Sequence, residues 1–564
     1  MQTTTAVMKR LATIVLFLGP VTTLAVSPYS SFDPINLIKM ILVSALAISV
    51  LALIVSTWTE SVIRLPPPVW IAAGFFLLWM TSALVLSGAP LNQQFWGVFG
   101  RNNGYLGYFS LIILLIAVAL IQKSTFYCKL IDALVLTAVP MTAYAIIQLA
   151  GKDPISWSVM APFATLGNIN FSSAFFGLAS LAATVLALAP KQNVLKRLSL
   201  SFLTIADLYI ILETGSIQGF MIYLAGMGIV GFFLIRSFRP TRILQIPYLT
   251  VGVISFALTC LALNNVGPLA RFVFGETILF RFDYWYAGWA MTSENPFFGV
   301  GLDSYGDWYR ELRGEIATLR TSPDRITNTA HNIYLDISAS GGIPLLLSYL
   351  VLLGCAFRAA WKVIQRDKSF NPYFVALFAT WVAYLIQAAI SINQIGVGIW
   401  GWLFTGGLIG YEIATRGNYP SSSKGQSQSK EKNHIDTVQL PARVALLGII
   451  GFVLGFVLSF IPFNADSNFK DSIQAGNLSE QFDKAKALGA TSYHMEITLD
   501  AAVRANDIAL ADAITDELLT RYPRNFMAWR LRQMLATSTR EEREEAYQRL
   551  KAMDPFNPDI QRLD

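Results

Sequence analysis

The sequence predicts an all-α, polytopic helical membrane protein with a small soluble helical domain at its C-terminus. Of its 564 residues, 54% are hydrophobic and only 14% are charged, whereas soluble domains carry roughly 25% charged residues. The charges are also unevenly placed, because residues 464–564 hold 30 of the 78 Lys, Arg, Asp and Glu side chains. This pattern excludes both a water-soluble fold for the whole chain and a disordered one.

Long apolar windows predict about 13 transmembrane helices. A helix needs ~20 apolar residues to cross the hydrocarbon core of a bilayer, and the chain offers such windows repeatedly before residue 463. The predicted spans are 9–27, 37–57, 68–87, 105–121, 130–149, 170–189, 198–214, 217–235, 243–263, 342–360, 372–391, 396–415 and 442–462. The span 198–214 is the least apolar of these, because it contains Asp207 and Glu213.

The distribution of Lys and Arg predicts the orientation, because cytoplasmic loops are enriched in these residues. With a cytoplasmic N-terminus, the inward loops carry 20 Lys and Arg. The short outward loops then carry only Lys39, Arg101 and Lys152. We therefore expect the long loop 264–341 and the C-terminal domain to be extracytoplasmic.

The domain organisation follows from these windows. Residues 1–415 form the predicted membrane domain, and residues 416–440 are a Ser-, Gln- and Lys-rich segment that is typical of a flexible cytoplasmic linker. The last predicted transmembrane helix, 441–463, then carries the domain 464–564 across the membrane.

The C-terminal domain, 464–564, shows the periodicity of paired amphipathic helices. Two units cover 479–505 and 507–534, and a third begins where Ser538 or Thr539 can cap a helix. A Pro-Asn signature occurs in RYPRNFMAW and again in MDPFNPDI. The spacing resembles tetratricopeptide repeats, which have a period of ~34 residues, and a generic α-hairpin domain fits equally well.

Several common catalytic motifs are missing from the sequence. The chain has no GxxxxGK[ST] loop, no Asp-x-Asp and no HExxH. Its three cysteines lie in apolar runs without metal-ligand spacing. We therefore expect no cofactor, no metal site and no nucleic-acid partner; the net charge of +6 is explained by membrane topology.

His331 is the histidine best placed for chemistry. It lies near the end of the outward loop, in TNTAHNIYLDISASGG, just before a span re-enters the membrane. Imidazole suits proton transfer near neutral pH, although a single interfacial histidine is more often structural. His434 and His494 are expected to be inert surface residues.

Two arginines of the outward regions are candidate anion ligands. Arg101 is the only charge between Arg64 and Lys123, and its planar donor fork suits phosphate oxygens. It could instead extend toward lipid headgroups. Arg281 lies among aromatic residues in LFRFDYWYAGWAM, and it could instead pair with Asp283 or Glu276.

Other polar segments have structural interpretations as well as functional ones. Asn168 and Asn170 precede a span and either cap its helix or bind hydroxyl groups. Residues 305–321 predict one amphipathic helix on the outer surface, with its charges on a solvated face. Asp207 and Glu213 are functional candidates because acids are costly within a membrane, or they pair with polar neighbours.

Two motifs resemble the shared domain of the O-antigen ligase and O-antigen polymerase superfamily. They are ENPFFGVGLDSYGDWY and HNIYLDISASGGIPLLLSYL, which bracket the large outer loop in that family, and GNINF and ETGSIQGFM also resemble its segments. The matching residues are Asn295, Pro296, Gly299, Gly301, His331, Asn332, Tyr334, Leu335 and Gly342. The resemblance covers roughly residues 70–412.

The resemblance implies a bacterial inner-membrane enzyme, a metal-independent, inverting glycosyltransferase that acts on the outer face. Its donor would be a glycan linked to polyprenyl diphosphate, and its acceptor a glycan, a lipid or a protein. The family histidine matches His331, and the family's essential arginines match Arg281 and Arg101. The segment with Ser216 departs from the family, because Ile217 stands where arginine is common.

Five further residues are candidate substrate-binding groups on this basis, namely Asn332, Asn168, Asn170, Tyr334 and Arg271. Besides donor and acceptor, the expected partners are membrane lipids and a protein that binds the C-terminal domain. Two alternatives to the enzyme remain, a transporter of lipid-linked glycans and a non-catalytic scaffold. The absence of repeated halves with polar sites at mid-membrane argues against the transporter.

Overall fold

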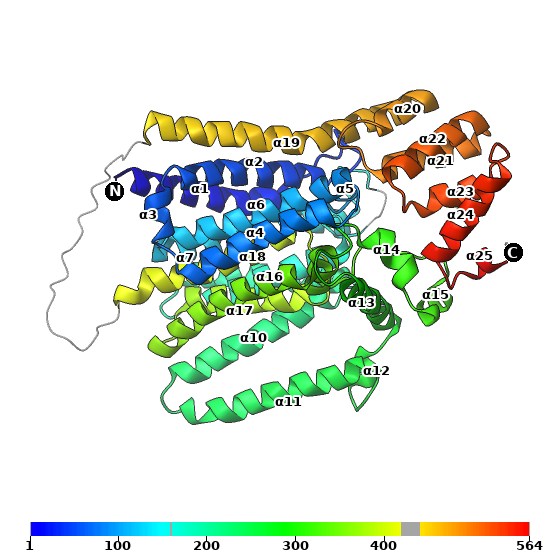
Figure 1. The fold of residues 1–564 in the computed structure, drawn as a ribbon. Coiled ribbons are helices and arrows are strands. Elements are labelled where there is room, and N and C mark those ends of the chain that lie inside the picture. The colour runs from blue at the N-terminus through cyan, green and yellow to red at the C-terminus, as the bar shows by residue number, and fades with distance from the viewer. Residues whose placement is uncertain (1, 158–160, 419–439, 563–564) are drawn as a thin grey trace.

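A computed structural model describes residues 2–157, 161–418 and 440–562, and the described segments are helices joined by loops, without a strand. The predicted all-α membrane fold is therefore confirmed (Figure 1). Most of the predicted linker 416–440 lies outside the described residues. His434 also lies outside them.

Each predicted span coincides with a helix. The helices are α1 (Gln2–Leu24), α2 (Asn36–Val55), α4 (Pro67–Leu86), α6 (Tyr105–Leu120), α7 (Ser124–Leu149), α8 (Ile169–Ala187), α9 (Val194–Glu213), α10 (Gln218–Ser237), α11 (Gln245–Leu263), α16 (Ile333–Arg366), α17 (Pro372–Ala388), α18 (Ile395–Thr415) and α19 (Ala442–Ala475). Within the described residues, nine helices are long and apolar enough to cross a membrane, and α6 and α17 are apolar but shorter. The chain is a multi-pass membrane protein, and the number of thirteen spans stays a prediction.

Close helix packing brings the last span back to the first ones. α19 packs along α2 through Gly448, Gly451 and Gly455. A Cβ atom on Gly455 would lie 2.6 Å from the carbonyl oxygen of Ser44, and one on Gly451 would lie 2.7 Å from that of Ile48. Small residues at this spacing let two membrane helices approach closely.

The two ends of the bundle differ. The start of α1 and the start of α19 lie at one end, whereas the loop helices and the C-terminal domain lie at the other (Figure 1). The loop helices are α12 (Ala270–Val273), α13 (Glu276–Glu294), α14 (Tyr305–Leu312) and α15 (Glu315–Thr321). This arrangement agrees with an odd number of crossings, which the Lys and Arg distribution also requires.

A topology measurement tests the predicted orientation. Alkaline phosphatase fused after Gly476, the residue that ends α19, is expected to be active, because this end of the bundle should face the extracytoplasmic side. A cytoplasmic reporter at the same position should be silent, and one fused after Leu149 should be silent as well. An active cytoplasmic reporter after Gly476 would show that the number of spans has the wrong parity.

The C-terminal domain consists of short antiparallel helices. They are α20 (Leu478–Ala485), α21 (Ser492–Arg504), α22 (Ile508–Arg521), α23 (Phe526–Met534), α24 (Arg540–Met553) and α25 (Pro558–Gln561). α19 continues past residue 463, and Phe469 packs into the core of this domain. Thr539 caps α24 in a capping box with Glu542, which confirms one of the two predicted caps. The tetratricopeptide assignment stays a prediction.

The segment 305–321 differs from the prediction in two ways. It forms two helices that break at Arg313 and Gly314. Two of its arginines are not solvated, because the buried carboxylate of Asp554 pairs with Arg310 at 3.0 Å and with the fully buried Arg313 at 2.8 Å. The C-terminal domain supplies these partners, which the periodicity of the segment alone does not reveal.

Two further contacts join the C-terminal domain to the outer loop and to α19. Arg524 pairs with Glu311 and lies 3.6 Å from the ring centroid of Trp308. His494 is buried, and its Nε2 lies 3.0 Å from Oδ1 of Asp466 in α19. The interpretation of His494 as an inert surface residue is therefore wrong, because the domain folds back over the end of α19.

Removing the Asp554 carboxylate should loosen the C-terminal domain. Asp554→Ala leaves the buried Arg313 guanidinium without its counter-charge, which costs about 3–5 kcal/mol when a buried pair is broken. We expect limited proteolysis of the purified full-length protein to cleave within 464–564 much faster than in the wild type. Asp500→Ala breaks an exposed pair with Arg504 and should leave the rate unchanged; equal rates for both variants would contradict the docking role of Asp554.

Candidate active site

The structure brings the three predicted catalytic residues together at the end of the bundle that carries the loop helices. Arg101 lies in the loop between α5 (Leu91–Trp96) and α6, Arg281 lies on α13, and His331 lies just before α16. The positive charges of Arg281 and Arg101 both reach His331 and lower the pKa of its imidazole. Residues separated by more than 200 positions in the sequence therefore form one cluster.

His331 is held as a neutral imidazole. Burial, followed by the charges of Arg281 and Arg101, lowers its pKa from 6.5 to about 3. Its ring stacks on Tyr284 at 5.3 Å between centroids, and within the described residues no side chain or backbone group is hydrogen-bonded to the ring. Its φ angle of +51° is uncommon for a residue other than glycine, and such backbone strain concentrates at functional sites.

A tight loop presents Arg101. Oδ2 of Asp303 accepts hydrogen bonds from the backbone N–H of Val98 (2.8 Å) and of Asn103 (3.3 Å). Position 97 must be glycine, because a Cβ atom there would lie 2.6 Å from Oδ2 of Asp303. The carboxylate of Asp303 thereby fixes both sides of the turn that carries Arg101.

The guanidinium of Arg101 is largely removed from water but has no direct partner among the described residues. Burial lowers its pKa, and the charges of Asp303, Asp336 and Asp33 act in the opposite direction. The interaction is mutual, because Arg101 partly offsets the burial that raises the pKa of Asp303 to about 6. The loop that carries Arg101 is thus fixed, while its donor fork is available to a ligand.

Arg281 is the second guanidinium whose charge acts on His331. Its Nη1 donates to the backbone carbonyl of Ile390, and burial lowers its pKa. The alternative in which Arg281 pairs with Asp283 is wrong, because Asp283 pairs with Arg320 at 2.8 Å. Glu276 is exposed at the start of α13.

The two sequence motifs interlock. Gly299 (φ +63°) packs so closely that a Cβ atom would lie 2.3 Å from the carbonyl oxygen of Ala339, and one on Gly342 (φ +77°) would lie 2.1 Å from that of Phe297. The helix α16 breaks at Gly342. The glycines therefore let the Pro296–Gly301 turn enter the break and fix the short helical segment that follows His331.

The predicted substrate-binding residues have the following surroundings. Asn332 is the N-cap of α16, where Oδ1 accepts from the N–H of Tyr334 (3.0 Å) and Leu335 (3.2 Å). The hydroxyl of Tyr334 donates to the carbonyl of Leu385 at 3.1 Å. Arg271 lies exposed on α12 and is not among the charges that shift the pKa of His331.

The upstream asparagines belong to a second polar group. Asn168 caps α8 by accepting from the N–H of Asn170, and Oδ1 of Asn170 accepts from the Ser216 hydroxyl at 2.8 Å. Ser173 binds the carbonyl of Ser216. The segments GNINF and ETGSIQGFM thus meet in space, although a substrate role for their residues stays a prediction. Asp207 accepts from Thr142 and Ser180, which fits the structural interpretation of that acid.

Sequence reasoning missed three members of the cluster. Asp303 and Gly97 shape the Arg101 loop, and Tyr284 supports the His331 ring. Asp303 directly follows the turn at Gly299 and Gly301. An acidic residue immediately after such a turn is the sequence feature from which its role could have been predicted. The partner of Gly97 lies about 200 residues away, so no local pattern identifies it.

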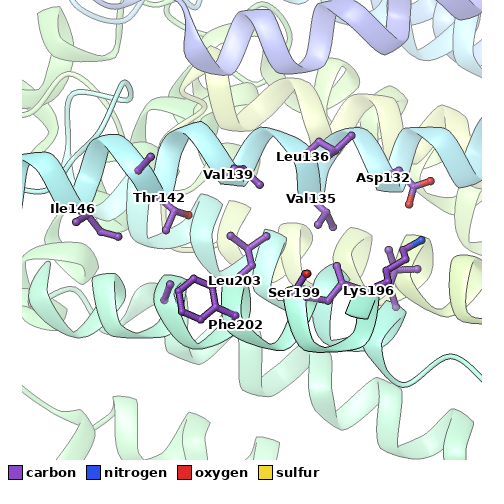
Figure 2. A pocket seen from close by; sticks show the side chains of 14 residues that line it. Asp132, Val135, Leu136, Val139, Thr142, Ile146, Lys196, Ser199, Phe202 and Leu203 are labelled. Atoms are coloured by element: carbon purple, nitrogen blue, oxygen red, sulfur yellow. The ribbon is translucent and has the colours of Figure 1, made fainter. Parts of the chain in front are cut away.

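A separate pocket of about 590 Å³ lies between α7 and α9. Figure 2 shows that its lining is mostly apolar, with Asp132 and Lys196 close together at one end. Tyr373 donates to Asp132 at 3.3 Å. Asp132 and Lys196 lie in the first halves of their helices, at the end that the Lys and Arg distribution places in the cytoplasm. The pocket is therefore not part of the candidate active site.

Comparison with known proteins supports the assignment from the motifs. Residues 200–350 match the family model described as O-antigen ligase. This region includes Arg281, Asp303 and His331, whereas Arg101 and the C-terminal domain lie outside it. No curated protein matches the chain. Residues 200–350 therefore match an O-antigen ligase domain, which confirms for this region the superfamily that the sequence motifs predicted.

Proposed function

We propose that the protein transfers a glycan from a polyprenyl-diphosphate carrier to an acceptor hydroxyl on the outer face of the membrane. The family match supports glycosyl transfer at the family level. The observation that carries the specific proposal is the cluster of two partly buried guanidiniums whose charges act on one neutral imidazole. Guanidinium forks bind phosphate oxygens in pairs, so the cluster suits a diphosphate group.

The proposed reaction needs little beyond charge stabilisation and orientation. The acceptor oxygen attacks the anomeric carbon, the bond from that carbon to the phosphate oxygen breaks, and the lipid diphosphate leaves with the bonding electrons. Inversion follows from attack on the face opposite the leaving group. Arg101 and Arg281 stabilise the charge that develops on the diphosphate, and no nucleotide is required because the donor is already activated.

His331 orients the acceptor in this mechanism. As a neutral imidazole it accepts a hydrogen bond from the attacking hydroxyl, and it takes the proton as negative charge develops on the neighbouring diphosphate. Before the donor binds, burial and the charges of the two arginines disfavour an imidazolium. The bound diphosphate offsets their charge, which makes His331 a stronger base when the donor is present.

The position of the cluster supports an enzyme rather than a transporter. Transporters bind their substrates near the middle of the membrane. Arg101, Arg281 and His331 instead lie in or beside loops at one end of the bundle, where a lipid-linked headgroup and an acceptor can meet.

Reconstitution with defined substrates tests the proposed function. Purified protein in detergent is mixed with a polyprenyl-diphosphate-linked glycan, and release of polyprenyl diphosphate is followed with and without acceptor. Acceptor-dependent release that is lost in His331→Ala is the expected result. In cells, deletion of the gene should remove long-chain glycan or leave it on the carrier, which separates a polymerase from a ligase. Full glycan assembly in the deletion strain would contradict the proposal.

A further inference from the structure

A cavity of about 560 Å³ lies between the outer loop and the C-terminal domain. The membrane domain contributes Val98 and Phe99, the start of α14 and Asn328, and the C-terminal domain contributes the starts of α21 and α23. The volume lies within the range of small-molecule binding sites, about 300–1,000 Å³. Neither part of the chain encloses the cavity alone.

The cavity adjoins the candidate active site. Arg101 follows Phe99 by two positions, Asn328 precedes His331 by three, and Gly306 follows Asp303 by three. Chain segments of this length span at most about 11 Å when fully extended. The three loops that carry Arg101, Asp303 and His331 therefore also contribute to the wall of the cavity, which places a ligand bound there near these groups.

The lining suits an uncharged molecule rich in hydroxyl groups. Asn328 provides an exposed amide for hydrogen bonds to hydroxyls, and Asp307 and Glu496 provide the carboxylate oxygens that do not accept from Gln93 and Asn525. Phe99 and Tyr493 stack on each other at 4.5 Å between centroids and provide an aromatic surface at the wall, against which the apolar face of a sugar ring can pack.

The charged side chains that line the cavity do not favour binding of the donor's diphosphate there. Arg310 is held by Asp554 and Arg524 by Glu311, so neither cation is left uncompensated. Asp307 and Glu496 add two further carboxyl groups to the lining. The diphosphate therefore belongs at Arg101 and Arg281, and the cavity is left for the uncharged partner of the reaction.

We propose that this cavity binds the acceptor, a neutral glycan of a few sugar units, and that the C-terminal domain thereby selects the acceptor. The role of the bound glycan as acceptor rests on the proposed function, whereas the binding of a glycan in the cavity does not. Tyr493 and Asn328 are the positions at which it is tested, because both side chains are exposed in the cavity and neither makes a contact within the Arg101–His331 cluster.

A binding experiment tests the cavity without requiring transfer. The full-length purified protein is applied to an array of neutral oligosaccharides of two to four sugars and to an array of peptides. We expect binding to at least one oligosaccharide, a loss of about tenfold in affinity for Tyr493→Ala, and loss of binding when Asn328→Trp fills the cavity. Tyr29→Ala removes an exposed tyrosine outside the cavity and should bind as the wild type does.

The remaining outcomes separate this inference from the proposed function. Absence of glycan binding, binding of peptides alone, or unchanged glycan binding in Asn328→Trp overturns the inference. In the transfer assay with the glycan that binds, Tyr493→Ala should raise KM for the acceptor about tenfold while kcat and KM for the donor stay constant. Transfer that depends on His331 but not on Tyr493 or Asn328 leaves the function standing and overturns the inference. Glycan binding at the cavity without any transfer overturns only the function.

Discussion

Replacing His331 with alanine is expected to lower the rate of glycan transfer by about 10²–10⁴, the usual contribution of a general acid–base group. The imidazole feels the charges of Arg281 and Arg101 and is stacked on Tyr284, so its loss removes the group that orients the acceptor in the proposed mechanism. The variant should still insert and fold, because no other residue in the described structure depends on a hydrogen bond to this ring. Single-turnover rates with purified protein measure the effect.

A second substitution separates the ring from the backbone at this position. His331 has a φ angle of +51°, which asparagine adopts more readily than alanine does. His331→Asn should therefore unfold at the wild-type temperature, yet transfer the glycan nearly as slowly as His331→Ala. A His331→Asn protein with wild-type activity would mean that the position needs only its backbone conformation, and it would remove His331 from the mechanism.

The pH dependence should not follow an ordinary histidine. Because the pKa of His331 is lowered to about 3, its neutral form is present throughout pH 5–9. Titration of His331 should therefore cause no rise in the transfer rate near pH 6.5 when the donor is limiting. Asp303 acts differently, because its pKa is raised to about 6. As pH falls below 6 it becomes protonated, and the negative charge that faces Arg101 is lost even though the fold favours the neutral acid. Activity should therefore decline below about pH 6. A wild-type rate with a histidine-like rise centred near 6.5 that disappears in His331→Asn would contradict the buried, neutral assignment.

Arg281→Ala is expected to lower transfer by about 10²–10³, the scale for loss of one group that stabilises charge in the transition state. Arg281→Lys should recover only part of this loss, because lysine keeps the charge but not the two-pronged donor geometry. Arg101→Ala should behave similarly. The measurement is kcat/KM for the lipid-linked donor at equal amounts of inserted protein.

The control for this prediction is Arg320, a guanidinium on α15 of the same outer loop that is already paired with a carboxylate. Arg320 pairs with Asp283 of α13 at 2.8 Å and does not act on His331, so Arg320→Ala should retain transfer. If Arg101→Ala also retains normal turnover, Arg101 does not bind the diphosphate, and its side chain only extends toward the lipid headgroups. If Arg281→Lys is as active as the wild type, the site recognises charge alone and the proposed pairing with two phosphate oxygens is wrong.

Local sequence patterns determined most of the membrane domain. Continuous apolar windows predicted where the helices lie, because a bilayer core allows few alternatives to a helix of this length. Two residues of the cluster were predicted for a similar reason: Arg101 is an isolated charge, and His331 lies beside a motif with glycines that a tight turn requires. Their identity was therefore available before their contacts were known.

The tertiary structure alone decided which charges are free and which are paired. Arg310 and Arg313 appear solvent-exposed in the periodicity of their segment, yet Asp554, more than 200 residues away, holds both. Asp283 was a possible partner of Arg281, but it pairs with Arg320. The cavity beside the cluster likewise exists only because the C-terminal domain docks on the loop. Helix positions depend on residues near in sequence, whereas a charge is partnered by whatever the folded chain brings within a few ångströms of it, and the second property cannot be obtained from the first.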